Sequence, residues 1–419
     1  MGSVRAVKGL TLGGIKGWRV VNTGRKEDMG GIIETPQYRF VVVGVGWRTL
    51  AYLRVVAALG ERFQLTGAVT RSQERAEEVR AAWGVDASPS LQGALEAGRP
   101  DFVVLSVPRS ATVEWLEELA DAGLPVLCET PPAADLAGLR RVNELATKGA
   151  QVQVAEQYQY QPLHSARLAL TDSGLIGDVS MASLAVCHDY HAFSLMRRHL
   201  KITDEPALVR ASVLRATVET GFETSGPRRS RGTVEEVRTV GMVEFGEGRH
   251  GVYDFADAQY FSYIRSPRVG LRGSIGEIAD HQVRYLRGLD EPVTQELRRE
   301  QTGEEGDLGG YSLRGISLGE RWVYRNPFPG ARLSDDEIAI ATSMEHMGRY
   351  AKGGPPFYGL PEASQDHYLS LCLHEAATTG GAVRTEPQPW TSSLLDMTVV
   401  GGPVLEPVVQ DRGTRKGTL

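Results

Sequence analysis

The stretch from Tyr38 to Leu59 constrains the fold of this chain most. Residues 40–43 (FVVV) join an aromatic to β-branched residues, a pattern typical of a buried strand. The glycines of Gly44-Val45-Gly46 end this run, and apolar residues at helical spacing follow. Such a turn lets a ligand approach the backbone, and the N–H groups at the helix start favour a pyrophosphate. The pattern predicts a nucleotide site, with an ordinary strand–helix turn as the alternative, because Thr49 stands at the third glycine position.

The composition of the chain limits the classes of protein to which it can belong. A chain of 419 residues with 41% hydrophobic and 23% charged residues is typical of globular proteins with about two to three domains. The net charge of -6 argues against a nucleic-acid partner. Cys128, Cys187 and Cys372 are too widely spaced for a zinc motif, so we expect a reducing compartment, the cytoplasm. No apolar run is long enough to predict a membrane span.

The first half of the chain alternates strands with helices. Alternation of this kind predicts parallel pairing through right-handed crossovers, so residues 38–156 are expected to form one doubly wound Rossmann domain with its ligand at the strand ends. Residues 1–37 are predicted to be an arm or extension without an assigned function. After the first helix, strands are expected at Gln64–Val69, Asp101–Val107, Pro125–Cys128 and Val152–Ala155, and helices at Gln73–Trp83, Ala111–Ala122 and Ala134–Lys148.

The second half has longer segments of alternating apolar and polar residues. They predict an α+β domain with a mainly antiparallel sheet over residues 157–385. Residues 287–333 are rich in charge and glycine and are predicted to be an inserted loop. Ser334 with Glu337 forms a capping-box pattern that predicts a helix to about Tyr350, and a second helix is expected at Ala363–Thr379. Residues 386–419 are predicted to be a loosely held tail.

Seven segments in order resemble the glucose-fructose oxidoreductase, inositol dehydrogenase and MocA family (Gfo/Idh/MocA). The resemblance implies a Rossmann domain joined to an open-faced antiparallel sheet, a nicotinamide dinucleotide, a carbohydrate-like substrate, and pairing of identical chains through the open sheet. The segments include VVVGVGWRT, AVTRSQERAEEVRAAWGV, LSVPRS, CETPPA, EQYQYQPLHSARLALTDSGLIGDV, HAFSLMRRHL and RVGLRGSIGEI.

Two positions depart from the family pattern. The family motif Glu-Lys-Pro, whose lysine contacts the nicotinamide ribose and the substrate, is here Glu129-Thr130-Pro131. The family motif H-x-x-D keeps its histidine as His191, but Ser194 holds the place of the aspartate. The resemblance therefore implies His191 as general acid/base in a site where two other catalytic groups have changed.

The residues themselves supply further catalytic candidates. Oxidation of a hydroxyl needs a base, and histidine has a suitable pKa. His191 and His188 lie together where a strand is expected to end, Asp189 would orient either imidazole, and Tyr160, like Tyr158, would donate a hydrogen bond to a substrate oxygen. The alternatives are packing or capping for the histidines and tyrosines and an exposed turn for Asp189. No spacing that includes Glu129 or Glu156 supports a metal site.

The corner Thr70-Arg71-Ser72 bears on the choice of cofactor. NAD-binding folds usually place an acidic residue at this corner, whereas hydroxyls and a guanidinium suit a 2′-phosphate, so the sequence favours NADP(H). A solvated Arg71 is the alternative. The remaining cofactor contacts implied by the turn and by the resemblance are Gly44, Gly46, Trp47, Arg48, Ser106, Pro108, Glu129 and Thr130.

These observations favour an NAD(P)-dependent oxidoreductase acting on a secondary hydroxyl or ketone of a sugar, glycoside or cyclitol. Two alternatives stay open because of the changed motifs. One is a redox-neutral lyase or glycosidase that oxidises a sugar transiently, and the other is a non-catalytic nucleotide-binding relative.

Overall fold

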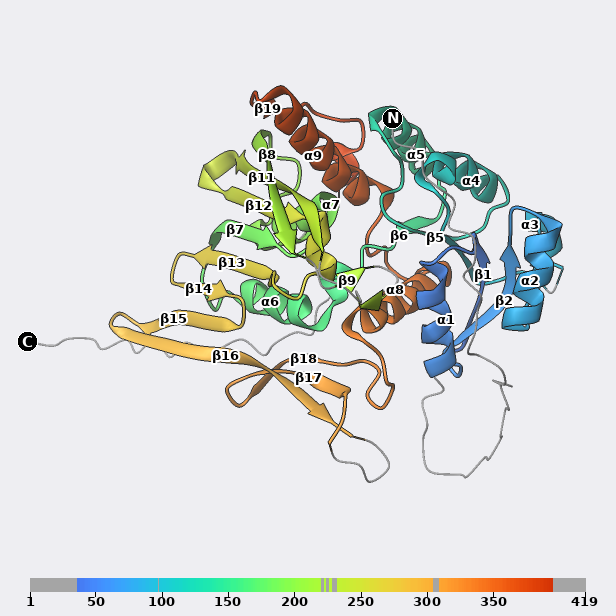
Figure 1. Ribbon diagram of the computed structural model, residues 1–419, viewed down its shortest axis with the longest axis horizontal. Coiled ribbons are helices and arrows are strands. Elements are labelled where there is room, and N and C mark those ends of the chain that lie inside the picture. The colour runs from blue at the N-terminus through green and yellow to red at the C-terminus, as the bar shows by residue number, and fades with distance from the viewer. Residues whose placement is uncertain are drawn as a thin grey trace, which may run out of the picture. The chain divides into compact units, whose positions relative to one another are not determined.

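The computed structural model describes residues 36–394 except 97, 220–221, 224–225, 228–231 and 304–308. The predicted N-terminal arm and residues 395–419 of the predicted tail therefore lie outside the described residues. Two large sheets follow one another along the chain, the first parallel and the second mainly antiparallel (Figure 1). The chain has the predicted α/β fold class.

The first sheet has the doubly wound strand order β3-β2-β1-β4-β5-β6, with all pairs parallel. Strands β4 and β5 are buried along their whole length, as expected where helices cover both faces. The order reverses between β1 and β4, where ligands bind in sheets of this kind. The strands are β1 (Tyr38–Val43), β2 (Phe63–Val69), β3 (Asp86–Ser88), β4 (Phe102–Leu105), β5 (Val126–Cys128) and β6 (Val152–Val154); the helices are α1 (Thr49–Ala58), α2 (Gln73–Trp83), α3 (Leu91–Ala94), α4 (Arg109–Asp121) and α5 (Leu136–Thr147).

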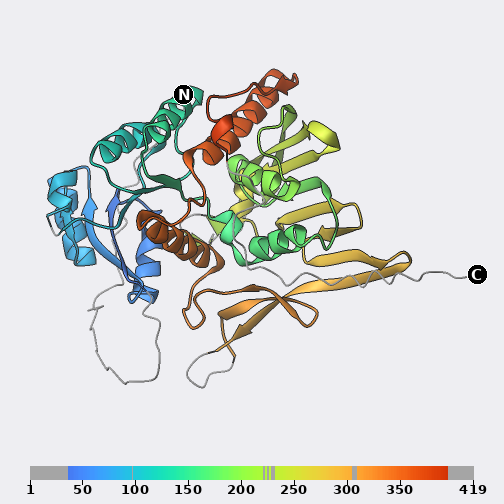
Figure 2. The ribbon, with the colours of Figure 1, turned by 180° about the vertical axis from the view of Figure 1, so that it is seen from behind.

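The second sheet has the strand order β18-β17-β16-β15-β14-β13-β7-β12-β11-β8-β19. Only β7 and β12 pair in parallel among the described strands of this sheet. Helices α6 (Pro162–Asp172), α7 (Asp189–Leu200) and α9 (Leu360–Thr379) lie on one face (Figure 2). Eight of its strands are β7 (Val179–Ala185), β8 (Ala207–Glu219), β11 (Thr233–Phe245), β12 (His250–Ala256), β13 (Arg268–Gly273), β14 (Gly276–Ala279), β15 (Gln282–Gly288) and the edge strand β19 (Val383–Arg384). Strands β9 (Phe222–Glu223) and β10 (Gly226–Pro227) pair separately.

The prediction of an inserted loop over residues 287–333 is wrong. This region forms β16 (Glu291–Thr302), β17 (Ser312–Leu318) and β18 (Arg321–Arg325), which extend the second sheet. In β16 the exposed Thr294, Glu296 and Arg298 alternate with less exposed positions, and the buried Leu297 among them is 2% exposed. The high content of charged residues suggested a loop, but a strand with one face exposed to solvent can have the same content.

The two late helices agree with the sequence. Helix α8 (Asp335–Ala351) begins with the predicted capping box, in which Ser334 Oγ accepts from Glu337 N and Glu337 Oε2 accepts from Ser334 N. Helix α9 spans the second predicted helix. The predicted loose tail is wrong for its first residues, because Trp390 is 2% exposed and its indole N–H donates to Gln365 Oε1 at 3.0 Å.

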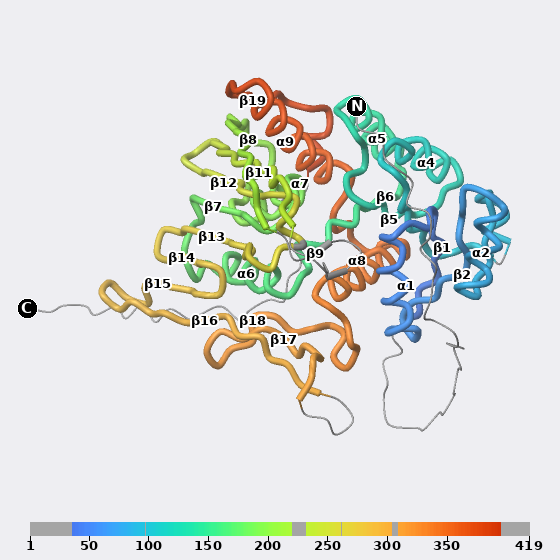
Figure 3. The backbone as a smooth tube through the Cα atoms, in the orientation of Figure 1, coloured from blue at the N-terminus to red at the C-terminus, as the bar shows by residue number. Residues whose placement is uncertain are grey.

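The connection between the two sheets positions the site. The backbone leaves the first sheet after β6 and forms the short helix η1 (Tyr158–Tyr160) before it enters α6 and the second sheet (Figure 3). Helix α7 follows β7 directly. Helix α8 packs against both α1 and η1, so the end of β6, the start of α7 and the glycine turn belong to neighbouring parts of the structure.

Candidate active site

The turn between β1 and α1 requires its glycines for two different reasons. Gly44 has a φ of 93°, and a Cβ there would lie 2.1 Å from the Ser106 carbonyl oxygen. A Cβ on Gly46 would meet no protein atom within 4 Å. Gly44 therefore permits the turn and its contact with the loop after β4, whereas Gly46 leaves space beside the backbone for a ligand.

A cavity of about 690 Å³ lies at the carboxyl ends of the central parallel strands. Its lining includes Gly46, Trp47, Arg71, Ser106 and Pro108, and the indole of Trp47 is exposed at this position. The volume falls within the range of about 300–1,000 Å³ that is common for ligand sites. The open backbone at Gly46 and the uncapped start of α1 fit the pyrophosphate of a dinucleotide.

The corner Thr70-Arg71-Ser72 after β2 lines this cavity, but the side chains of Thr70 and Ser72 form hydrogen bonds within the protein. The hydroxyl of Thr70 donates to the Ser72 carbonyl at 2.9 Å. Ser72 Oγ accepts from the Arg75 amide at 3.2 Å and caps α2. The exposed Arg71 has no bonding partner among the described residues, so the charge available to a ligand here comes from Arg71.

Glu129 follows β5 and is held by groups of α1. It accepts from Arg48 Nε at 2.9 Å and from the Tyr52 hydroxyl at 2.7 Å, and Arg48 also pairs with Asp336 at 3.1 Å. These acidic neighbours raise the pKa of Arg48 despite its burial. The side chain of Arg48, which was predicted to contact the cofactor, is thus directed toward the end of β5.

Thr130, at the position of the family lysine, is joined to helix α7. Its side chain lies near the Tyr190 hydroxyl, which accepts a hydrogen bond from Arg109 Nη2 at 3.4 Å. The Arg109 guanidinium also lies over the Tyr190 ring, 5.6 Å from its centroid. Burial raises the pKa of Tyr190 to about 12, so this group is a neutral phenol near pH 7.

His191 forms a buried pair with Glu156, the second residue after β6. Its Nδ1 lies 2.6 Å from Glu156 Oε2, and the other carboxylate oxygen accepts from the Tyr158 amide at 3.1 Å. The imidazole ring packs against Tyr158 and Tyr190. Since a carboxylate only accepts, Nδ1 carries the proton of the neutral imidazole and Nε2 is an acceptor, with no bonding partner among the described residues.

The other histidine of the predicted pair has a different partner. His188 Nδ1 lies 2.6 Å from the Tyr260 hydroxyl, and the His188 backbone N–H donates to that oxygen at 2.9 Å. Tyr260 comes from the short helix η3 (Asp257–Phe261) after β12. Burial lowers the pKa of His188 and favours its neutral form.

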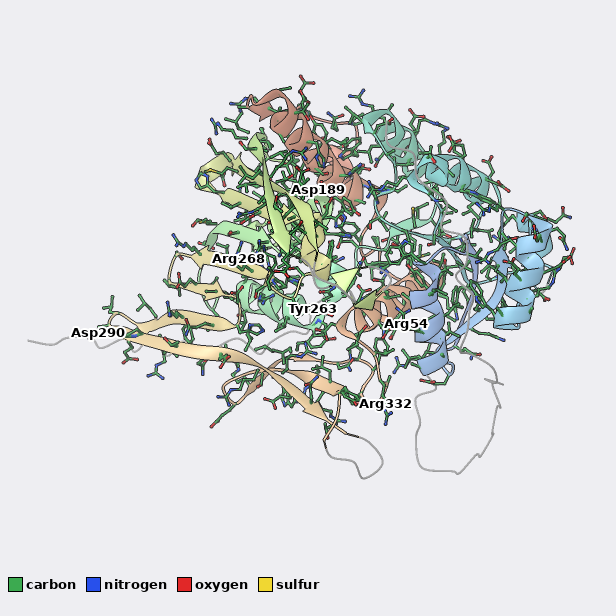
Figure 4. All side chains as sticks on the ribbon, in the orientation of Figure 1. Arg54, Asp189, Tyr263, Arg268, Asp290 and Arg332 are labelled. Atoms are coloured by element: carbon green, nitrogen blue, oxygen red, sulfur yellow. The ribbon has the colours of Figure 1, made fainter. Side chains whose placement is uncertain are left out.

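Asp189, expected to orient one of these imidazoles, pairs instead with His374 of α9. Figure 4 labels Asp189, where α7 and α9 lie side by side. Its Oδ2 bonds His374 Nε2 and its Oδ1 accepts from the Tyr190 amide at 2.7 Å. The hydrogen bond to His374 holds the pKa of Asp189 at about 2 against the opposing effect of burial, and Asp189 raises the pKa of His374.

Tyr160 lies apart from this group. Its ring stacks on His346 of α8 at 5.2 Å, and its hydroxyl is buried with no hydrogen-bond partner in the described chain. The structure therefore gathers His188 and His191 with Tyr158 and Tyr190, but it does not bring Tyr160 to them. Neither Glu156 nor Tyr260 was expected to contact the histidines; a carboxylate two residues after a parallel strand was the signal for Glu156.

No group of three or more His, Cys, Asp or Glu in the described ranges could hold a metal ion. Within the same ranges, every helix is too short or too polar to cross a membrane.

Comparison with known proteins supports the nucleotide-binding half. Residues 38–158 match the family described as oxidoreductase family, NAD-binding Rossmann fold. Inositol 2-dehydrogenase of Streptomyces avermitilis is 32% identical over 143 residues, which are 32% of this chain and 40% of the relative. The chain thus matches less than half the length of its curated relatives.

Solved structures share the fold over most of the chain. A levoglucosan dehydrogenase in complex with NADH and levoglucosan is 14% identical with a TM-score of 0.59, covering 84% of this chain and 100% of that protein. A myo-inositol dehydrogenase from Corynebacterium glutamicum is 15% identical with a TM-score of 0.56, covering 84% and 100%. The family match thus covers the first sheet and its helices, and the solved structures show that the fold is shared over both sheets.

Proposed function

We propose that this protein is an NAD(P)-dependent oxidoreductase acting on a secondary hydroxyl or ketone of a sugar, glycoside or cyclitol. The observation that carries the proposal is the 2.6 Å pairing of His191 Nδ1 with Glu156, which leaves Nε2 as a proton acceptor. The names of the relatives, inositol and levoglucosan dehydrogenases, support a polyol or sugar as substrate.

Each group has a proposed role in this reaction. A bound nicotinamide would supply the hydride acceptor. His191 Nε2 would take the proton of the substrate hydroxyl, and the buried Glu156 carboxylate would stabilise the imidazolium that results. Glu129 and Thr130 at the end of β5 would hold the nicotinamide ribose, Glu129 being fixed by Arg48 and Tyr52.

The missing lysine does not leave this part of the site without positive charge. Arg109 donates a hydrogen bond to the Tyr190 hydroxyl, near which Thr130 lies. We assign to Tyr190 the hydrogen-bonding role beside the reacting oxygen, because its neutral phenol keeps a donor near neutral pH.

For the cofactor, we propose a preference for NADP(H) that depends on Arg71. Its guanidinium lines the cavity without a bonding partner among the described residues and suits a 2′-phosphate. Glu74 lines the same cavity and would favour a free ribose hydroxyl, so the preference is directly testable.

We also propose that two copies of the chain pair through the open face of the second sheet. On the face of β8 and β11 that points away from α9, the apolar side chains of Leu214 and Met242 are exposed. Light scattering on the full chain, compared with a Leu214→Glu Met242→Glu variant, tests this pairing; a wild type that is monomeric at micromolar concentration contradicts it.

The function is tested with the purified full chain, NAD⁺ or NADP⁺, and myo-inositol or levoglucosan as probes, by the absorbance of the reduced nicotinamide. We expect reduction of at least one cofactor. The mass of any nucleotide that co-purifies with the protein distinguishes the proposed reaction from the redox-neutral alternative. In that alternative, NAD is retained and no net reduction occurs. Failure of both dinucleotides to bind in a calorimetric titration would overturn the proposal.

A further inference from the structure

We propose that Arg109 binds a carboxylate group of the substrate, so that this site takes sugar acids, such as uronates, in preference to neutral sugars. The inference rests on the proposed function and deepens it by naming a group that the substrate carries besides the reacting hydroxyl. Arg109 is the first residue of α4 and directly follows Pro108, which lines the dinucleotide cavity. Its side chain is exposed and therefore accessible to a ligand.

The guanidinium of Arg109 lies beside the proposed catalytic groups. Its Nη2 donates to the Tyr190 hydroxyl at 3.4 Å, and its central carbon lies 5.6 Å from the centroid of that ring. The centroid of the His191 ring lies 4.4 Å from the same centroid, and the side chain of Thr130 lies near the Tyr190 hydroxyl. A sugar that places one hydroxyl at His191 can therefore reach Arg109 with another group.

The carboxylates around Tyr190 already have partners, whereas Arg109 is not neutralised. Glu156 and Asp189 each pair with a histidine. In the described part of the chain, Arg109 forms no ion pair with a carboxylate, including the exposed Asp257 of η3, and its one hydrogen bond is that to Tyr190. Most of the five N–H groups of its guanidinium are thus available to a ligand.

A carboxylate fits this environment better than a phosphate or a neutral group. The planar guanidinium matches the two oxygens of a carboxylate, and one positive charge balances one negative charge. A phosphate carries about −1.5 to −2 charges near pH 7. Burial raises the pKa of Tyr190, and the cation that opposes this rise is Arg109. A neutral sugar would cover the guanidinium without supplying a counter-charge, which is unfavourable.

The preference for an acid is tested by calorimetric titration of D-glucuronate and its neutral amide, D-glucuronamide. Each is added to the full chain saturated with NADPH or NADH, because the reduced dinucleotide prevents turnover of an alcohol. We expect the uronate to bind about 10-fold more tightly than the amide, the lower end of the range for a hydrogen bond to a charged group because Arg109 is exposed. D-Galacturonate and its amide form a second pair with the other configuration at C4. Equal affinities within both pairs, or no binding of any of the four compounds, would overturn the inference.

The role of Arg109 itself is tested by substitution. Arg109→Gln should bring the ratio of the two affinities close to one, and Arg109→Lys should keep part of the preference for the uronate. Arg99→Gln is the matched control, because Arg99 bonds the Gly123 carbonyl away from the cavity lining. A preference that persists in Arg109→Gln would contradict the assignment.

Two further measurements separate the carboxylate from other anions. D-Glucose 6-phosphate should bind less tightly than the uronate, and tighter binding would identify a phosphate subsite instead. The affinity for NADPH is measured in Arg109→Gln as well. If it falls as much as the affinity for the uronate, Arg109 contacts the pyrophosphate of the cofactor and the inference is wrong.

The inference and the proposed function fail in different ways. If neutral polyols reduce the cofactor and the uronates show no advantage in kcat/KM, the inference is wrong and the proposed function stands. If neither dinucleotide binds, the proposed function is wrong, and the inference that rests on it falls as well.

Discussion

Glu156 and His191 pair at 2.6 Å, although one follows a strand of the parallel sheet and the other lies on a helix that covers the second sheet. The carboxylate is 1% exposed and the imidazole 6% exposed. The pair therefore joins the nucleotide-binding half of the chain to the half that is proposed to hold the substrate, and it fixes which imidazole nitrogen accepts a proton.

Glu156→Gln should lower turnover by about 10²- to 10⁴-fold without loss of cofactor affinity, because an amide permits the wrong imidazole tautomer and stabilises the imidazolium less. Steady-state kinetics and a calorimetric titration of the dinucleotide measure the two effects. The matched control is Glu375→Gln, an exposed carboxylate on α9. Full turnover in Glu156→Gln would remove the carboxylate from the mechanism.

Gly46→Val should abolish dinucleotide binding in a folded protein. The new side chain meets no protein atom within 4 Å of its Cβ and occupies the space beside the backbone that a pyrophosphate needs. Gly246→Val is the matched control, because a Cβ at Gly246 also meets nothing within 4 Å but lies after β11. Equal nucleotide affinity in the two variants would contradict a site at this turn.

Arg71→Ala should weaken NADPH binding by about 1.5–3 kcal/mol, the range for a hydrogen bond to a charged group, and leave NADH binding nearly unchanged. Titration of both dinucleotides measures this difference. Arg99→Ala is a control, since Arg99 bonds the Gly123 carbonyl away from the cavity lining. A wild type that binds NADH as tightly as NADPH would refute the preference.

The pair of His374 and Asp189 should make stability depend on pH. The pKa of His374 is raised above its ordinary value of 6.5, so the stabilisation is complete below about pH 6.5 and is lost as the pH rises through the raised pKa. Because His374 is half exposed, we expect less than about 1 kcal/mol.

Urea unfolding at about pH 6 and about pH 9 measures this loss. His374→Gln should remove it, while His281→Gln, at an exposed histidine of the second sheet, should not. If the free energy of unfolding of His374→Gln still differs between the two pH values as much as that of the wild type, groups other than His374 cause the pH dependence. At acid pH, the stabilisation from this pair should be lost as the pH falls from about 3.8 to about 2, because Asp189 then becomes protonated.

The sequence predicted the features that depend on local periodicity. The alternation of strands and helices predicted the doubly wound sheet, Gly44 and Gly46 predicted the tight turn after β1, and the capping box at Ser334 predicted the start of α8. The prediction of a loop over residues 287–333 was wrong because a strand with one solvated face can be as rich in charged residues as a loop.

The contacts between distant segments were not predictable. Glu156 meets a histidine 35 residues further along the chain, and Asp189 meets His374, 185 residues away. Such pairs depend on how α7 packs against η1 and α9, which no local pattern encodes. The same reason explains why Tyr260 was missed and why the side chain of Arg48 turns toward Glu129.

The central claim is that His191 carries the proton, and His191→Asn tests it most directly. His199→Asn is the matched control, because His199 is buried on the same helix and its pKa is lowered to about 3 by burial, which makes it unsuitable as a base at neutral pH. Turnover and dinucleotide affinity are measured for both variants after folding is verified by circular dichroism. We predict a loss of turnover of about 10²- to 10⁴-fold in His191→Asn, with cofactor affinity retained and nearly normal turnover in His199→Asn. Full turnover in folded His191→Asn would contradict the account.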